Sequence, residues 1–415
     1  MAHLPHTAVF TDNHSRKSEF AQRVLEGHTP AELGFLKGLK GGFFSNESLA
    51  AFLEEEARHE SSELQPDLHR PLQTYSSGER KKALLRYLLY RQPGYLILDD
   101  PFDNLDRAFQ AALRAELERI AQTVILIQLV SRPSDRMAFI SQTAFLQGTA
   151  LTGFPDYEPA SSGMPPGDGQ RIPPAPYPLP DLPEVLVDFR NASLSYPGKS
   201  VLKNIDWTIR QGDFWELRGP NGSGKTSLIT LISGDNPKAY GMELYLFGAR
   251  KGSGESVWDI KEHIGYFTPA LADRFKGYHT VENMLISGLT DSIGLYVKPG
   301  DTQRALAADW LRLLGMEARK DTLFCDLTAG EQRLVFCARA MIKHPPLLIL
   351  DEPTAGLDPQ AAALVVALIR KMAEESQTAL VFVSHRDEPG LHADGVFELI
   401  PGPGGSKGKI WRNRP

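Results

Sequence analysis

The chain has 415 residues, of which 42% are hydrophobic and 23% are charged, and its formal net charge is −6 at pH 7. This composition is that of an ordinary globular protein, so it excludes disordered and collagen-like chains. At roughly 150 residues per domain, the length predicts two or three domains.

Several classes of site and location are excluded by the same counts. Binding of nucleic acid without regard to sequence usually requires an excess of basic residues, and this chain has none. The two cysteines, Cys325 and Cys337, are too few for a disulfide framework, a four-thiolate zinc site or an iron–sulfur centre, and we expect both to be small buried side chains. The apolar runs are shorter than the ~18–20 residues of a membrane span, and the N-terminus does not resemble a signal peptide. We therefore expect a cytoplasmic protein, with peripheral attachment to the inner face of the cell membrane through a partner left open.

In chain order, the first clear pattern is a helix followed by a buried strand, in SSGERKKALLRYLLYRQPGYLILDDPFDNLD from Ser76. The polar Ser76–Glu79 turn opens the helix, the leucines that follow have helical spacing, and Gln92-Pro93 ends it. YLIL then reads as a parallel strand that delivers two acids at its carboxyl end, where α/β sheets place ligands.

A proline-rich segment follows at residues 151–185, which contain 10 of the 30 prolines. Because proline does not fit helix interiors or central strands, this segment is predicted to be an extended, semi-rigid linker. It separates a first domain at residues 1–150 from a second at residues 186–415.

The second domain contains a phosphate-binding loop that fits G-x-x-x-x-G-K-[ST]. A strand is predicted before the loop and a helix after it, which is the context that the motif requires. Glycines allow backbone N–H groups to surround a phosphate, the helix N-terminus favours negative charge, and lysine and threonine side chains serve the phosphates and Mg²⁺. The predicted ligand-binding residues are Gly219, Pro220, Asn221, Gly222, Ser223, Gly224, Lys225, Thr226 and Ser227.

The helix–strand pattern then recurs at Thr328, as TAGEQRLVFCARAMIKHPPLLILDEPTAGLD, 252 residues after Ser76 and without a gap. Gly78 and Gly330, Asp99 and Asp351, and Asp106 and Asp358 all match in register. Duplication of one domain explains this agreement. A remnant of the phosphate loop is also visible at Thr11–Ser18, where Lys17 and Ser18 match Lys225 and Thr226 but the glycines are missing.

Together these residues resemble the ATP-binding cassette (ABC) ATPases over nearly the whole chain. GPNGSGKT is similar to the Walker A loop, LTAGEQ to the signature motif, LLILDEP to Walker B and AGLD to the D-loop. The resemblance implies ATP and Mg²⁺ as cofactors. It also implies roles for single residues: Thr226 and Asp351 on Mg²⁺, Lys225 on the phosphates, Glu352 as catalytic glutamate, His385 as switch histidine and Tyr196 as the aromatic that stacks on adenine.

Simpler interpretations of some of these residues stay open. Tyr196 and His385 also fit core positions at strand ends, Glu352 fits a solvated charge pair, and the turn at Ser76 fits a helix cap. The expected fold is α/β, with two P-loop NTPase domains in tandem, each a mainly parallel sheet with a helical subdomain. The N-terminal copy is predicted to be truncated and degenerate, because Asp100 replaces the glutamate and no histidine follows its TVILIQLVS strand, where Arg132 is the nearest counterpart.

ABC domains pair head to tail, so the resemblance implies two unequal composite sites within this chain. The competent site combines the second-domain residues with Ser76, Gly78 and Asp106 of the first domain. The degenerate site combines Lys17 and Ser18 with Thr328 and Gly330.

Two fused domains and these signatures most resemble the tandem ATP-binding proteins of the molybdate-transport and photorepair type. The implied function is an ATP-hydrolysing subunit that serves a separate membrane permease, with no nucleic-acid partner. The coupling surface would lie at roughly residues 268–315, where Phe275, Tyr278, Val281, Met284 and Leu285 serve either as contact positions or as core. A soluble ABC ATPase with a regulatory or translation-related role is the alternative, while a DNA-repair ATPase is disfavoured by the absence of heptads and zinc cysteines.

Overall fold

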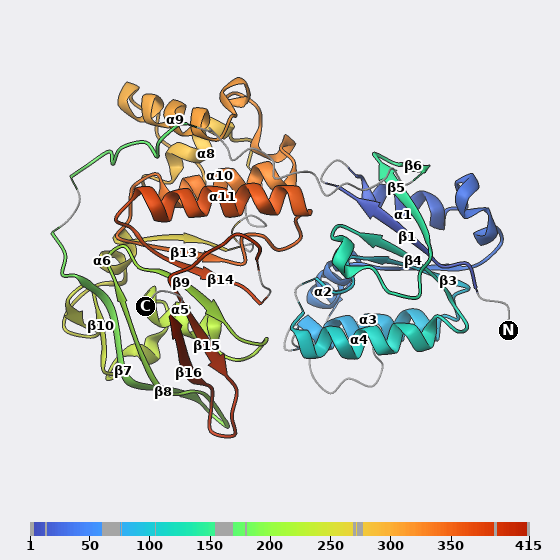
Figure 1. Ribbon diagram of the computed structural model, residues 1–415, viewed down its shortest axis with the longest axis horizontal. Coiled ribbons are helices and arrows are strands. Elements are labelled where there is room, and N and C mark those ends of the chain that lie inside the picture. Colours follow the sequence, from blue (N-terminus) through green and yellow to red (C-terminus); the bar gives the residue numbers. More distant parts are fainter. Residues whose placement is uncertain are drawn as a thin grey trace. The chain divides into compact units, whose positions relative to one another are not determined.

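The computed structural model describes residues 4–12, 15–59, 75, 77–103, 105–153, 169–178, 181–268, 271, 277–385 and 388–412 (Figure 1). The chain forms two compact units, each with many more residue contacts within itself than with the other. Unit 1 comprises Met1–Ser161 with Ala355–Pro359, and unit 2 comprises Ser162–Thr354 with Gln360–Pro415.

Unit 1 is built on a sheet of six described strands in the order β2-β3-β4-β1-β5-β6. All neighbouring strands are parallel except β5 and β6, which are antiparallel. The strands are β1 (Thr7–Thr11), β2 (Gly41–Phe44), β3 (Tyr95–Asp99), β4 (Ile125–Val130), β5 (Gln142–Gln147) and β6 (Ala150–Gly153). The α-helices are α1 (Lys17–Leu25), α2 (Asn46–His59), α3 (Ser77–Tyr90) and α4 (Arg107–Ile120), and η1 (Ala31–Leu36) and η3 (Pro133–Asp135) are short 3-10 helices.

Helices cover both faces of this sheet, with α1 on one side and α3 and α4 on the other (Figure 1). Alternation along β3 explains the two cores: Ile97 packs with Phe20 of α1, whereas Leu96 packs with Leu84 of α3 and Leu113 of α4. Strands buried on both faces read as continuous apolar runs, which is why YLIL could be recognised from the sequence.

Unit 2 contains a sheet with the same strand order, β12-β13-β14-β9-β15-β16. Its strands are β9 (Phe214–Arg218), β12 (Ile264–Phe267), β13 (Leu347–Asp351), β14 (Ala379–Val383), β15 (Gly395–Ile400) and β16 (Lys407–Arg412). The prediction of two α/β copies is confirmed, because each strand of the first sheet has a counterpart at the same place in the second.

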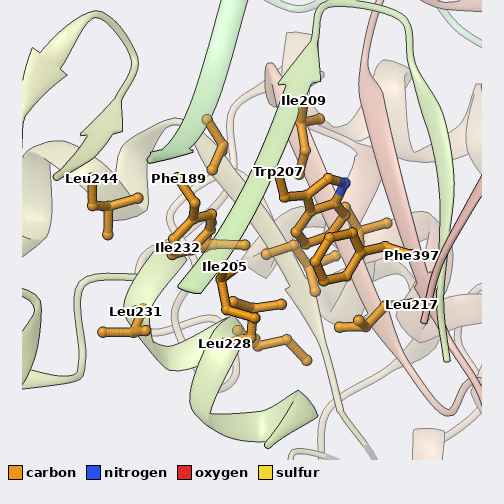
Figure 2. Close-up of a cluster of buried hydrophobic side chains, with 14 of the residues drawn as sticks. Phe189, Ile205, Trp207, Ile209, Leu217, Leu228, Leu231, Ile232, Leu244 and Phe397 are labelled. Atoms are coloured by element: carbon orange, nitrogen blue, oxygen red, sulfur yellow. The ribbon is translucent and has the colours of Figure 1, made fainter. Parts of the chain in front are cut away.

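Unit 2 also has a four-stranded antiparallel sheet, made of β7 (Val185–Tyr196), β8 (Lys199–Arg210), β10 (Leu244–Leu246) and β11 (Ala249–Arg250). Side chains of this sheet pack over α5 (Lys225–Ile232) in a core that contains Trp207, Leu228 and Phe397 (Figure 2). The described part of unit 1 holds no counterpart of this sheet. The remaining α-helices of unit 2 are α6 (Val257–Glu262), α8 (Val281–Ser287), α9 (Asp301–Leu313), α10 (Ala329–Met341) and α11 (Pro359–Glu375).

The helical subdomains differ in length. Residues 268–328 join β12 to α10 and contain α8 and α9, whereas residues 45–76 join β2 to α3 and contain α2. Val281, Met284 and Leu285 of α8 are at most 1% exposed. They therefore belong to the core of the subdomain, and the interpretation of these three residues as contact positions is wrong because the apolar face of α8 is turned toward α9 and α10.

The proline-rich segment is extended where it is described, at residues 169–178 and 181–184, but it is not a free spacer. Ile172 is 9% exposed, its N–H donates to Glu375 Oε2 at 2.8 Å, and the Pro173 carbonyl lies 2.7 Å from His344 Nε2. Gln211 Nε2 donates to the carbonyls of Leu182 and Pro183. The second part of the linker is thus held against unit 2.

Two further expectations concern the cysteines and membrane spans. Cys337 is buried, but Cys325 is exposed, so its prediction as a buried side chain is wrong. Cys325 lies on a short 3-10 turn, where one side of the chain faces solvent. Of the helices that the structure describes, none combines the length and hydropathy needed to cross a membrane.

Candidate functional site

The loop between β9 and α5 has a backbone that only glycine fits. Gly219, Gly222 and Gly224 have φ of 152°, 77° and 102°, which side chains rarely adopt. A Cβ on Gly219 would lie 2.6 Å from Ser223 Oγ and 2.9 Å from the Leu399 carbonyl oxygen, and a Cβ on Gly224 would lie 2.8 Å from Leu202. The loop therefore has the tight, open-backbone form that lets N–H groups approach an anion.

Lys225 is the first residue of α5 and is 9% exposed. Its Nζ donates to the carbonyl oxygens of Gly219 at 2.7 Å and Pro220 at 3.3 Å, so the ammonium is held across the loop. The hydroxyl-bearing Thr226 follows at the helix N-terminus, where partial positive charge favours phosphate.

Three further predicted residues, Asp351, Glu352 and His385, gather at the carboxyl ends of β13 and β14. Asp351 ends β13 and is paired with Val383 in the parallel register. Glu352 follows with φ 49°, and its N–H donates to the Val383 carbonyl at 3.0 Å. His385, two residues beyond Val383, is thereby brought to Glu352, with 3.0 Å between His385 Nδ1 and Glu352 Oε1.

Asp351 lies in an environment that disfavours its charge. Burial and the neighbouring Glu352 carboxylate raise the pKa of Asp351 to about 6, against a smaller opposite effect of the Lys225 ammonium. A cation between the phosphates and this carboxylate would relieve the cost, and a hydroxyl with a carboxylate is a donor set that Mg²⁺ accepts. The residues at this site therefore fit the cation that the sequence implies.

Tyr196, predicted to stack on adenine, ends β7 and is 40% exposed. Its hydroxyl accepts a hydrogen bond from Asn236 Nδ2 at 3.0 Å, and the Lys238 ammonium lies 5.4 Å from the ring centroid. The ring is accordingly on the surface of unit 2 and is not a core residue.

The signature turns are helix N-termini in both units. Thr328 caps α10 in a capping box with Glu331, whose N–H donates to Thr328 Oγ1 at 3.3 Å. In unit 1, Gly78 is buried in the first turn of α3, and Asp106 caps α4 by accepting from Phe109 N at 2.8 Å. Ser76 lies outside the described residues.

The matching place in unit 1 has the same order of strand and helix but a different loop and different chemistry. The N-cap of α1 is Arg16 with φ −91°, where its counterpart Gly224 has φ 102°, so the loop has a different shape. Asp100 has φ 37° and donates its N–H to Leu129, as Glu352 does to Val383. Lys17 Nζ contacts both Asp99 and Asp100, and Ser18 Oγ donates to Glu47.

The strand register corrects one sequence assignment. Asp99 pairs with Leu129 and Asp351 pairs with Val383, so the residue that corresponds to His385 is Ser131, two beyond Leu129, and not Arg132. Ser131 N and Oγ donate to Asp100 at 2.9 and 2.6 Å. Sequence reasoning missed Ser131 because the connection from β3 to β4 is two residues shorter than the one from β13 to β14, and only the strand register shows this difference.

Comparison with known proteins agrees with this geometry. A family model described as ABC transporter matches residues 202–355. The ABC transporter ATP-binding protein ModF of Escherichia coli (strain K12) is 37% identical over 337 residues, which cover 77% of this chain and 68% of that protein. An uncharacterized ABC transporter ATP-binding protein of Schizosaccharomyces pombe is 30% identical over 365 residues, or 85% of this chain and 73% of that protein.

Among solved structures, cbiO1 from Clostridium perfringens, described as part of the ABC transporter complex cbiONQ, aligns with 56% of this chain and 89% of its own, at 24% identity and a TM-score of 0.49. The two relatives above extend across both units, with the phosphate loop and the Asp351–Glu352 pair falling within the matched family model. This chain therefore belongs to the ABC transporter ATP-binding protein family, whose members are ATPases.

Proposed function

We propose that unit 2 carries the ATP-hydrolysing site of this chain, with Lys225, Thr226 and Asp351 holding Mg²⁺-ATP and Glu352 acting as the general base. The observation that carries the proposal is the contact between His385 Nδ1 and Glu352 Oε1, 3.0 Å long, beside the carboxylate of Asp351. A base that is held by a second side chain is the arrangement that general-base catalysis uses.

Each group has a distinct task in this scheme. Glu352 accepts the proton of the attacking water, and His385 fixes the direction in which its carboxylate points. The Lys225 ammonium and the loop N–H groups bind the phosphate oxygens and stabilise the charge that grows on them in the transition state. Mg²⁺, held by Thr226 and Asp351, would neutralise charge on the phosphates.

The proposed site is composite. A nucleotide on Gly219–Thr226 would meet the N-terminal turn of α3, with Ser76, Gly78 and Asp106 supplied by unit 1, and Tyr196 would stack on its base. The position of Gly78 in the first turn of α3 supports this assignment, since a helix N-terminus favours anions. The second composite site, with Lys17, Ser18, Thr328 and Gly330, would be inactive because Lys17 is paired with carboxylates.

The first prediction tests the base. Glu352→Gln should keep nucleotide binding but lower turnover by roughly 10²-fold or more, the usual scale for loss of a general base. Steady-state ATPase rates and equilibrium binding of a fluorescent ATP analogue measure the two effects separately.

The matched control for Glu352→Gln is Asp100→Asn, which makes the same chemical change at the corresponding position of unit 1. Its turnover should stay within about twofold of wild type, since that carboxylate faces Lys17 and not a nucleotide. Wild-type turnover in Glu352→Gln, or equal losses in both variants, would refute the assignment.

A membrane permease is the partner that we propose for this ATPase. Tyr278, Tyr296 and Val297 of the helical subdomain are 86%, 80% and 76% exposed, and His279 packs edge-on against Tyr296. Such exposed aromatic side chains support a contact surface near the end of β12, where the predicted coupling surface lies. Phe275, the other predicted contact position, lies outside the described residues.

A soluble, non-transport role, regulatory or translation-related, is the second candidate. The linker counts against the translation-related form, because translational ABC proteins usually have a long, charged helical linker and this segment is not helical where it is described, so the regulatory form is the better supported of the two. Copurification from cells separates the two candidates: a multi-span membrane protein supports transport, and a ribosome or no partner supports the alternative.

A further inference from the structure

Unit 1 contains a cluster of polar side chains at the place where unit 2 has its proposed catalytic groups, and its members are Lys17, Asp99, Asp100 and Ser131. Lys17 Nζ lies 3.2 Å from Asp99 Oδ1, contacts Asp100 Oδ2 and donates to Ser131 Oγ at 2.8 Å. Ser131 in turn donates to both oxygens of Asp100. The lysine and the two aspartate side chains are only 17–22% exposed.

The equivalent lysine of unit 2 behaves differently. Lys225 Nζ donates to the two loop carbonyls of Gly219 and Pro220, whereas Lys17 Nζ lies against two carboxylates. The difference follows from the loop: the glycine backbone of 219–224 presents carbonyls to Lys225, whereas Arg16 at φ −91° sends the chain into α1 by another path.

The residues of unit 1 therefore do not fit a Mg²⁺-nucleotide. We propose that Lys17 is a built-in counter-ion, which takes the place of a divalent cation between Asp99 and Asp100, so that unit 1 is stable without nucleotide or metal. Removal of the ammonium then leaves a vacant pair of carboxylates that accepts a divalent cation. This proposal does not depend on hydrolysis at unit 2.

Charge and burial together require such a counter-ion. Asp99 and Asp100 are adjacent, and burial raises the pKa of Asp99, while the Lys17 ammonium and the bonds from Ser131 outweigh burial and lower the pKa of Asp100. Asp99 Oδ1 is buried and, among the described residues, accepts no hydrogen bond other than from the facing Lys17 ammonium, while the Lys81 ammonium adds a smaller attraction to this carboxylate. Removing one partner of such a pair leaves an uncompensated charge, which is costly.

The experiment uses the full chain with Lys17→Ala, without nucleotide. Tryptophan emission reports unit 2 alone, because all five tryptophans lie at or beyond Trp207, whereas far-UV circular dichroism reports both units. Unit 1 contributes the circular dichroism transition that tryptophan emission does not report. Lys17→Ala should lower the melting temperature of that transition by roughly 3–8 °C and leave the tryptophan transition of unit 2 unchanged. Added Mg²⁺ or Mn²⁺ should restore the melting temperature of the variant more than that of wild type.

A second readout counts the cation directly. Titration with Mn²⁺, followed by the loss of the free-ion electron paramagnetic resonance signal, should show one more bound Mn²⁺ per chain in Lys17→Ala than in wild type. Lys17→Ala/Asp100→Asn should lose this extra ion, and Lys17→Arg, which keeps the charge, should not gain it. An unchanged Mn²⁺ count in Lys17→Ala, with a wild-type melting temperature, overturns the proposal.

If Lys17→Ala does not fold, a double-mutant cycle still decides. Lys17→Met/Asp100→Asn removes both charges, so it should melt higher than Lys17→Met alone if the two groups are coupled. Additive losses in this cycle would instead show that Lys17 and Asp100 act independently, and the counter-ion assignment would fail.

Discussion

Two lysines at matching positions, Lys17 and Lys225, show how a single residue type can have opposite roles. Each is the first residue of a helix that follows the first strand of its parallel sheet. What differs is the preceding loop, since three positive-φ glycines direct Lys225 toward loop carbonyls and none is present before Lys17. The residues that surround a lysine, and not the lysine itself, decide whether it is available to phosphate.

A prediction on nucleotide affinity follows from this contrast. Lys225→Ala should weaken ATP binding by roughly 10–150-fold, because a hydrogen bond to a charged group contributes ~1.5–3 kcal/mol. Lys17→Ala should leave affinity unchanged, since that ammonium is paired with Asp99 and Asp100. A fluorescent ATP analogue should report about one high-affinity site per chain, and two equal sites would contradict the asymmetry.

At this scale, the sequence predicted which residues of unit 2 meet and could not predict which meet in unit 1. The contact between Glu352 and His385 follows from motif spacing and parallel strands. The Lys17 cluster depends on a loop conformation that no motif describes, and Ser131 depends on a two-residue difference in the strand connections. Sequence motifs describe the residues of active sites. The side-chain contacts of a site whose motif residues are missing are therefore harder to predict from the sequence.

At the scale of elements, the parallel strands and the helices that begin at polar turns were predictable, and the path of the linker was not. Buried runs such as YLIL and LLIL mark strands whichever neighbours they have. Proline content predicts an extended segment but says nothing about what it lies against, and here Ile172 and Pro173 are buried on unit 2. His344, which follows α10 with φ 53°, holds this segment through the Pro173 carbonyl.

The linker contact predicts a pH dependence. Burial lowers the pKa of His344, against a smaller opposite effect of the Pro173 carbonyl. The unfolded chain therefore takes up a proton before the folded one, so this stabilisation is complete above about pH 6.5 and is lost as pH falls toward the folded-state pKa. His344→Gln should flatten the decline in unit 2 melting temperature between pH 7 and pH 5, followed by tryptophan emission.

Glutamine suits this test because Gln92 holds the matching position in unit 1 with φ 51°. His392→Gln is the matched control, since His392 is an exposed histidine with φ 49°. An unchanged slope in His344→Gln, or an equal change in both variants, would show that the linker contact does not titrate.

At the scale of the whole molecule, the duplicated topology explains why a unit without its own catalytic groups keeps the signature turn of α3. Unit 1 has lost the glycine loop, the glutamate and the histidine, yet Gly78, Asp99 and Asp106 retain the spacing of Gly330, Asp351 and Asp358. The retained spacing is explained if the turn binds a nucleotide held by unit 2, because the backbone N–H groups at a helix N-terminus donate hydrogen bonds to anions.

The test of this pairing must allow for a steric problem at Gly78. A Cβ on Gly78 would lie 2.5 Å from Phe109 Cε2, so Gly78→Asp alone would disturb α3 and α4 as well as any phosphate. Phe109→Ala removes that ring and serves as the background. Phe109→Ala alone should melt lower than wild type, by an amount typical of a partly buried aromatic, and hydrolyse ATP at a rate within a few-fold of wild type.

In this background, Gly78→Asp adds a negative charge to the N-terminal turn of α3, which would weaken the attraction of that turn for a γ-phosphate bound at Lys225 and should lower turnover at least roughly 10-fold without a matching loss of ATP binding. In the proposed composite site this contact would form only when the turn closes on the nucleotide, so turnover should fall more than first binding. Gly330→Asp makes the same change in the first turn of α10, where it would reach only the inactive composite site, and its effect should be milder. The two variants are compared by their ATPase rates, each measured the same number of degrees below its own melting temperature. A larger loss in Gly330→Asp would mean that the turn of α10 serves the working site, and pairing between two chains would then have to replace pairing within one.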